Sequence, residues 1–204
     1  MKSSLYGASA EYALHSLLIM LARTEPVSVR DLARFQSLPE RFLAKLFTRL
    51  KRAGIVHGME GIRGGFALAR PPQRITVMDV LAAVDPNRHL FECAEIRRNC
   101  ELFGTKPPKW SVTGPCRIHL VMQEAEHALQ SFLTSKSLAD LGNEFERKAP
   151  HQFIQDSEGW FKQRRSERTN SPREELPMDS SHSHPGASSK PRKHQPKNKE
   201  KPHV

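Results

Sequence analysis

The stretch SLPERFLAKLFTRLKRAGIVHGMEGIRGGFALAR, residues 37–70, decides the fold. Apolar residues recur at helical spacing in its first half and predict a helix that reaches Ala53 and ends at Gly54. Ser37 and Glu40 have the spacing of a capping box, which would begin this helix. The opposite face of the helix is polar and mainly basic, and consists of Arg41, Lys45, Thr48 and Arg52 with Arg49 beside them.

The second half of the stretch predicts a β-hairpin. Residues 55–59 and 66–70 have strand composition, and the connection between them contains three glycines. Glycine permits the tight turn that such a connection requires, and Arg63 lies at its tip. The hairpin follows the basic helix directly, as the wing does in a winged helix.

The flanking residues complete a helix-turn-helix. Ser28 and Asp31 form a capping box that predicts a short helix over 28–35, just before the basic helix. Residues 10–22 predict an amphipathic helix, and a capping box at Thr76 and Asp79 begins another helix that reaches Val84. The sequence therefore predicts a mainly α winged helix-turn-helix over residues 1–85.

The basic helix and the wing predict a surface that binds double-stranded DNA. Arginine and lysine favour guanine in the major groove, and other basic side chains contact phosphates. We expect major-groove contacts from Arg41, Lys45, Thr48 and Arg49, a wing contact from Arg63, and phosphate contacts from Arg30 and Arg52. A solvated polar helix face is the alternative interpretation. The formal net charge of +10 is weaker support, because residues 161–204, with 11 Lys/Arg and 5 Asp/Glu, hold +6 of it.

All three cysteines, Cys93, Cys100 and Cys116, fall in a segment rich in proline and glycine. An odd number of cysteines argues against a disulfide framework. Thiolates gathered on a loop suit a soft metal or an iron–sulfur cluster. Buried structural thiols are the alternative. We therefore predict a sensor loop over residues 86–116.

The last part of the chain predicts a dimerisation helix and a tail. Residues 117–134 have a long apolar stripe that a small monomer would leave uncovered, so we expect a homodimer helix within 117–145; packing against its own winged helix is the alternative. From about residue 146 to 204 the periodicity is lost, which predicts a mostly disordered basic tail. No apolar run approaches the length of a membrane span and no secretion signal is evident, so the expected location is cytoplasmic.

These pieces resemble the Rrf-type winged-helix regulators, the family of IscR, NsrR and RirA. The matching stretches are EYALH at 11–15, FLAKLFTRL at 42–50, AGIV at 53–56, GIRGGF at 61–66 and ITVMDVLAAVD at 75–85, followed by three cysteines and a long helix. The resemblance covers roughly residues 1–145. It implies a homodimeric transcription factor, commonly a repressor, that binds a palindromic operator.

The resemblance also implies an iron–sulfur cluster. Many members hold a [2Fe–2S] or [4Fe–4S] cluster on three cysteines, and in some a further ligand comes from the partner's N-terminal helix, where Glu11 and His15 fall. Here six and fifteen residues separate the cysteines, wider than usual. This spacing favours [2Fe–2S] on Cys100 and Cys116 with Glu11 and His15 of the other chain, and leaves Cys93 as a spare or alternative thiol. A solvated or dimer-interface hydrogen-bonded pair is the alternative interpretation of Glu11 and His15.

The implied function is a regulator that senses redox state, nitric oxide or iron status. A regulator of the same fold without iron is the alternative, with a thiol/disulfide switch or a zinc ion bound with His15 or His119. An enzyme is not expected, because the sequence has no nucleophile–base constellation and no phosphate-binding loop.

Overall fold

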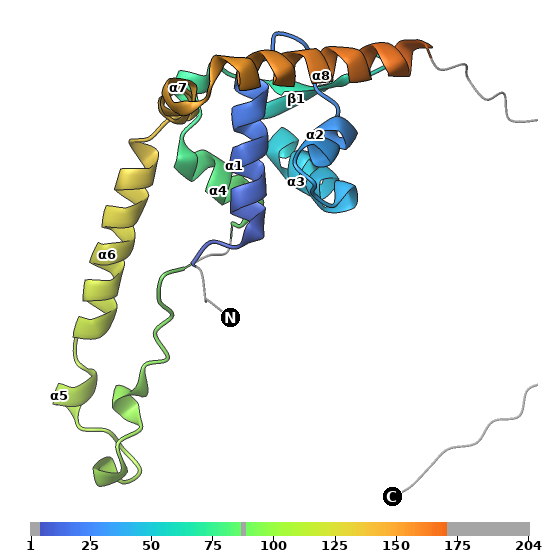
Figure 1. Ribbon diagram of the computed structural model, residues 1–204. Coiled ribbons are helices and arrows are strands. Elements are labelled where there is room, and N and C mark those ends of the chain that lie inside the picture. Colours follow the sequence, from blue (N-terminus) through green and yellow to red (C-terminus); the bar gives the residue numbers. More distant parts are fainter. Residues whose placement is uncertain (1–4, 87–88, 171–204) are drawn as a thin grey trace, which may run out of the picture. The chain divides into compact units, whose positions relative to one another are not determined.

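The computed structural model describes residues 5–86 and 89–170. Its elements, in chain order (Figure 1), are α1 (Ala8–Leu21), α2 (Val29–Phe35), α3 (Glu40–Arg52), β1 (Val56–Met59), β2 (Gly65–Leu68), α4 (Val77–Val84), α5 (Lys109–Val112), α6 (Arg117–Thr134), α7 (Leu138–Lys148) and α8 (His151–Asn170), with short 3-10 turns at Pro72–Arg74, Ile96–Arg98 and Glu101–Phe103. The structure is thus mainly helical with one two-stranded sheet, as predicted.

One apolar core holds the helix-turn-helix together. The inner face of α3 is fully buried and consists of Leu43, Leu46, Phe47 and Leu50. It packs in the same cluster as Ala13 and Leu17 of α1, Leu32 of α2, and Ile75 and Val80. Burial of each large side chain stabilises the fold by about 1.5–3 kcal/mol. The prediction that α3 has one apolar and one exposed basic face is confirmed.

The turn between α2 and α3 differs from the prediction. Ser37 does not cap α3, because Pro39 is the N-cap residue and no side chain caps the helix there. Ser37 instead has a left-handed backbone (φ 54°) and ends α2, while the Leu38 N–H donates to the Ala33 carbonyl. A residue in this conformation closes a helix C-terminus, so the predicted capping box is wrong. The box at Ser28 is confirmed in part, since its hydroxyl accepts from the Asp31 N–H.

The wing is a short antiparallel hairpin that is attached to the core. β1 and β2 pair from Val56 with Leu68 to Met59 with Gly65. The backbones of Phe66 and Val27 exchange two hydrogen bonds, of 2.8 and 2.9 Å, which join β2 to the α1–α2 connection. A Cβ on Gly65 would lie 2.6 Å from the Val27 carbonyl, so only glycine permits this approach. The wing is therefore held against the body of the domain.

Two capping boxes connect the winged helix to the helices after it. The Thr76–Asp79 box at the start of α4 is confirmed, and the Ser137–Asp140 box begins α7, a helix of three turns. Thr76 and Ser137 also form an isolated β-bridge, which places the first turns of α4 and α7 side by side. The long helix α6 runs between the cysteine segment and α7, and none of its residues is buried.

Helix α8 corrects the prediction of a disordered tail from residue 146. Residues up to Lys148 belong to α7, and His151–Asn170 form the longest helix that the structure describes. The rings of Trp160 and Phe161 lie 5.2 and 5.0 Å from the ring of Phe35 on α2. This aromatic packing fixes α8 to the domain. Residues 171–204 of the predicted tail lie outside the described residues.

Ion pairs strengthen the contact between α8 and α2. Asp31 is 2% exposed, and its carboxylate pairs with Arg168 and lies 3.8 Å from Arg164 Nε. Arg165 pairs with Glu25 at 2.6 Å in the α1–α2 connection. Paired charges can be buried where an isolated charge cannot. Among the described residues, no helix is long and apolar enough to cross a membrane.

We expect Asp31→Ala to lower the free energy of unfolding by about 2–3 kcal/mol, because it leaves Arg164 and Arg168 without their common carboxylate. Urea denaturation followed by circular dichroism measures the change. Glu146→Ala, on the exposed face of α7, is the control and should alter stability by less than about 0.5 kcal/mol. Equal effects of the two substitutions would contradict the role of Asp31.

Candidate DNA interface and candidate metal centre

The outer face of α3 carries the predicted DNA-binding residues. Arg41, Lys45, Thr48, Arg49 and Arg52 are all exposed. The buried residues of α3 lie on one face of the helix, so the basic residues point away from the core and are accessible. A helix that presents such a face can enter a major groove.

Three members of the predicted set also have partners within the chain. Arg49 Nη1 donates to the Val84 carbonyl at 2.5 Å, at the C-terminus of α4. Thr48 Oγ1 donates to the Ala44 carbonyl of the preceding turn. Arg30, on α2, lies 3.8 Å from Glu40 in an exposed ion pair. Among the described residues, Arg41, Lys45 and Arg52 form no such hydrogen bond or ion pair, so they are the most available for DNA.

The wing places a further basic residue beside this face. Arg63 is exposed in the connection between β1 and β2, as predicted, next to Ile62, which is 52% exposed. Because the wing is tied to Val27 through β2, the position of its tip is coupled to the helix-turn-helix. The wing can therefore contact DNA next to the groove that α3 would occupy.

The cysteine segment brings two of its three thiols together. Cys93 lies near enough to Cys116 for its side chain to affect the pKa of Cys116, and Cys100 is exposed. All three are free thiols. Arg97 joins the two ends of the segment, since it pairs with Glu95 and donates to the Gly114 carbonyl at 3.2 Å. The spacing of the cysteines favoured Cys100 as the partner of Cys116, and that choice of ligands stays a prediction.

Cys116 is placed so that its thiolate is stabilised. It is the N-cap residue of α6, so its sulfur lies beside the backbone N–H groups of the first turn, those of His119 and Ile118. These N–H groups, that of His119 above all, lower the pKa of Cys116 below that of an ordinary thiol, with a smaller contribution from the charge of Arg97. A metal binds the thiolate and not the thiol, so this position suits a ligand.

His119 is a further candidate ligand, which the sequence suggested only for a zinc ion. It lies one turn into α6, with its ring 6.3 Å from that of Phe91. Its Nδ1 is buried and has no hydrogen-bond partner within the part of the chain that the structure describes. A buried imidazole nitrogen without a partner is costly, and a metal would satisfy it. The Cys-x-x-His spacing of residues 116–119 was the available signal.

A single chain supplies only part of a metal site. Glu11 and His15 are exposed on α1, where a second copy of the chain could reach them. Within residues 5–86 and 89–170, no three His, Cys, Asp or Glu side chains are gathered closely enough to hold a metal ion. The donor chemistry therefore fits a thiophilic group, with Cys93 and Cys116 in place and the remaining donors still to be brought to them.

We expect Cys116 to react with iodoacetamide at lower pH than N-acetylcysteine does, because its lowered pKa leaves more thiolate at any given pH. Mass spectrometry of the apoprotein over a pH series locates and quantifies the modification. Arg97→Gln should move the midpoint for Cys116 upward, and Arg98→Gln should move it less. A midpoint at or above that of N-acetylcysteine would contradict the assignment.

The sequence is similar to known transcriptional regulators. A family model described as "Rrf2: Iron-dependent Transcriptional regulator" matches residues 6–144. The chain is 30% identical over 133 residues to the HTH-type transcriptional regulator NsrR of Geobacillus kaustophilus, covering 64% of this chain and 84% of that protein. It is 28% identical over 151 residues to IscR of Aliivibrio salmonicida, covering 72% and 83%.

A solved structure shows the same fold. The structure of CymR, the global cysteine regulator of B. subtilis, superposes with a TM-score of 0.51 at 24% identity, over 71% of this chain and 98% of that one. The family match extends from α1 into α7 and includes the winged helix, the cysteine segment and α6. The chain therefore belongs to the Rrf2 family, a family of transcriptional regulators and not of enzymes.

Proposed function

We propose that this protein is a homodimeric repressor that binds a palindromic operator and responds to redox state, nitric oxide or iron status. The observation that carries the proposal is the exposed basic face of α3 beside the wing, on a chain whose family regulates transcription. Arg41 and Lys45 would contact base edges in the major groove, and Arg52 and Arg63 would contact phosphates or the adjacent groove.

The exposed apolar residues of α6 support the homodimer. Ile118, Val121 and Phe132 are 65%, 56% and 60% exposed, and no residue of this helix is buried in the single chain. Large apolar side chains that remain exposed along one helix indicate a partner surface. A second copy would place two α3 helices on one duplex, which is why the operator would be palindromic.

The sensor would be an iron–sulfur cluster, [2Fe–2S] in preference to [4Fe–4S], bound at the cysteine segment. Cys93 and Cys116 would supply two thiolates, and Cys100 and His119 are further donors in the same segment and in α6. Glu11 and His15 of a second copy remain the candidates from α1. Such a group supplies reversible one-electron chemistry, and nitrogen or carboxylate ligands raise its potential.

The contact between Cys93 and Cys116 favours one alternative, a regulator of the same fold without iron. Two thiols in contact, one of them stabilised as a thiolate, can form a disulfide when a peroxide accepts their two electrons. The same pair with His119 could instead hold zinc. Colour and metal content distinguish these possibilities from a cluster.

We expect Arg41→Ala and Lys45→Ala each to weaken binding to the operator about tenfold and to relax its sequence preference. Arg52→Ala should weaken binding to all sequences alike and reduce the slope of affinity against salt by about 0.9. Fluorescence anisotropy on a duplex selected by the wild type from a random library measures both effects. Lys148→Ala, on α7, is the control, and losses no greater than its own would contradict the interface.

We expect anaerobically purified protein to show visible absorbance, with about two irons and two sulfides per cluster. Cys116→Ala should lose the bands and His119→Ala should shift or weaken them, because both remove a donor. His127→Ala, two turns further along α6, should leave them unchanged. A colourless protein after reconstitution with iron and sulfide would contradict the cluster, and zinc in the metal assay would favour the alternative.

A further inference from the structure

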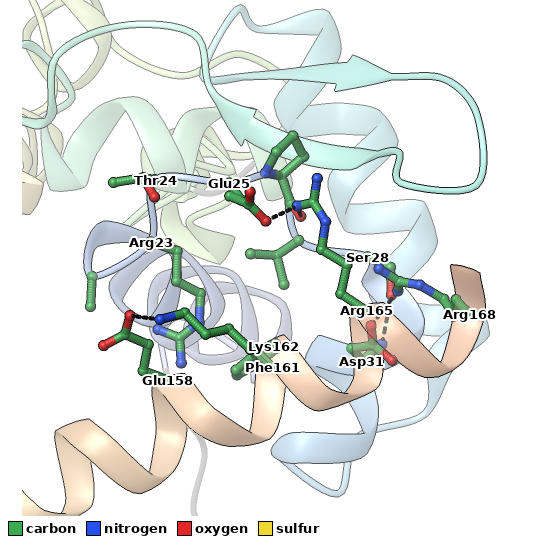
Figure 2. A pocket seen from close by; sticks show the side chains of 13 residues that line it. Arg23, Thr24, Glu25, Ser28, Asp31, Glu158, Phe161, Lys162, Arg165 and Arg168 are labelled. Carbon is green, nitrogen blue, oxygen red and sulfur yellow. Dashed lines mark hydrogen bonds and ion pairs between the residues drawn. The ribbon is translucent and has the colours of Figure 1, made fainter. Parts of the chain in front are cut away.

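A cavity of about 240 Å³ lies between the α1–α2 connection and α8 (Figure 2). Its lining combines basic side chains with the apolar side chains of Val27 and Phe161. Clefts that hold drug-sized ligands measure about 300–1,000 Å³, so an occupant of this cavity would be small. We call this cavity, with its lining residues, the α8 pocket.

Three of the four cations that line the α8 pocket are matched by a carboxylate. Figure 2 shows the pairs. Arg165 lies 2.6 Å from Glu25, Lys162 lies 2.6 Å from Glu158, and Arg168 pairs with Asp31. These three pairs include every acidic residue that lines the pocket. The fourth cation, Arg23, forms no ion pair with a carboxylate among the described residues.

Arg23 is held in the pocket by neutral groups. Its guanidinium donates to the Ile19 carbonyl at 2.9 Å and to the Ser157 hydroxyl, and it stacks 4.1 Å from the centre of the Phe161 ring. Its Nε is buried without a hydrogen-bond acceptor among the described residues. Burial lowers the pKa of Arg23, and the charge of Glu158 offsets this only in part. The pocket therefore contains one partly desolvated cation whose nearest carboxylate, that of Glu158, is paired with Lys162.

We propose that the α8 pocket binds a small organic carboxylate. The carboxylate would pair with the guanidinium of Arg23, and the apolar body of the ligand would lie against Val27 and Phe161. The pocket joins α8 to the first turn of α2, where Ser28 and Asp31 belong to its lining. An occupant would therefore hold α8 against the helix-turn-helix. This site is separate from the cysteine segment and does not depend on a cluster or on its signal.

Tryptophan fluorescence can report on the pocket. The chain has two tryptophans, Trp110 in the cysteine segment and Trp160, whose ring lies 4.8 Å from that of Phe161. In full-length Trp110→Phe protein the emission comes from Trp160 alone. Titration with benzoate should change this emission to saturation, and should raise the melting temperature because the ligand binds only the folded state.

The ligand analogues test the two parts of the proposal. Benzamide has the same ring without the charge and should bind at least about tenfold more weakly, as expected for the loss of a charge-assisted hydrogen bond. Inorganic phosphate has the charge without the ring. Affinity for benzamide equal to that for benzoate would overturn the role of the anion, and equal affinity for phosphate would overturn the role of the apolar body.

Substitutions at Arg23 and Lys162 test whether Arg23 binds the carboxylate. Arg23→Gln should bind benzoate at least about tenfold more weakly, and Arg23→Lys should recover part of the loss. Lys162→Gln, an exposed substitution that the fold should tolerate, frees Glu158 to compete for Arg23 and should also weaken binding. Arg147→Gln, on α7, is the matched control. Saturable binding that survives in both Arg23→Gln and Lys162→Gln, or no response to benzoate in the wild type, would overturn the proposal.

Discussion

The packing of α3 against α1 is the contact on which the rest of this molecule depends. Leu43, Phe47 and Leu50 are fully buried against the face of α1 that contains Ala13 and Leu17. Because successive positions of a helix point in fixed directions, burial of this face determines which side chains face outward. The basic face of α3, and so its availability for DNA, is a consequence of the core.

The same contact connects the DNA-binding surface to the proposed sensor. Helix α1 packs against α3 on one side and α4 on another, and α4 in turn contacts α6, whose N-cap is Cys116. Arg49 adds a direct link, since it donates from α3 to the last carbonyl of α4. A continuous path of packed elements therefore connects the cysteine segment to α3.

Helix α8 extends the family fold in this chain. The family match ends at residue 144, within α7, whereas α8 begins at His151 and packs back on α2. Its attachment is partly aromatic and partly ionic, and it encloses the cavity around Arg23. The ionic part explains why a residue such as Asp31 can be buried in a small domain.

Local chemistry was enough to predict most of the elements. Apolar periodicity located α1, α3, α4 and α6, the capping box at Thr76 marked a helix start, and the glycines of 60–65 marked the wing. These signals act over one or two turns of chain, so they can be read without knowledge of the fold. The family assignment followed from their order along the chain.

Contacts distant in sequence decided the rest. Serine is a common N-cap residue, but Ser37 ends α2. Its left-handed backbone turns the chain so that α3 packs on the core. One face of α8 carries Ser157, Phe161, Arg164 and Arg168, a composition typical of a solvent-exposed face. It is a contact face because Asp31 of α2 pairs with its two arginines. Three other features also depend on contacts between separate segments. They are the proximity of Cys93 to Cys116, the burial of His119 Nδ1 and the partly buried charge of Arg23. Burial and pairing are properties of such meetings, and no local pattern encodes them.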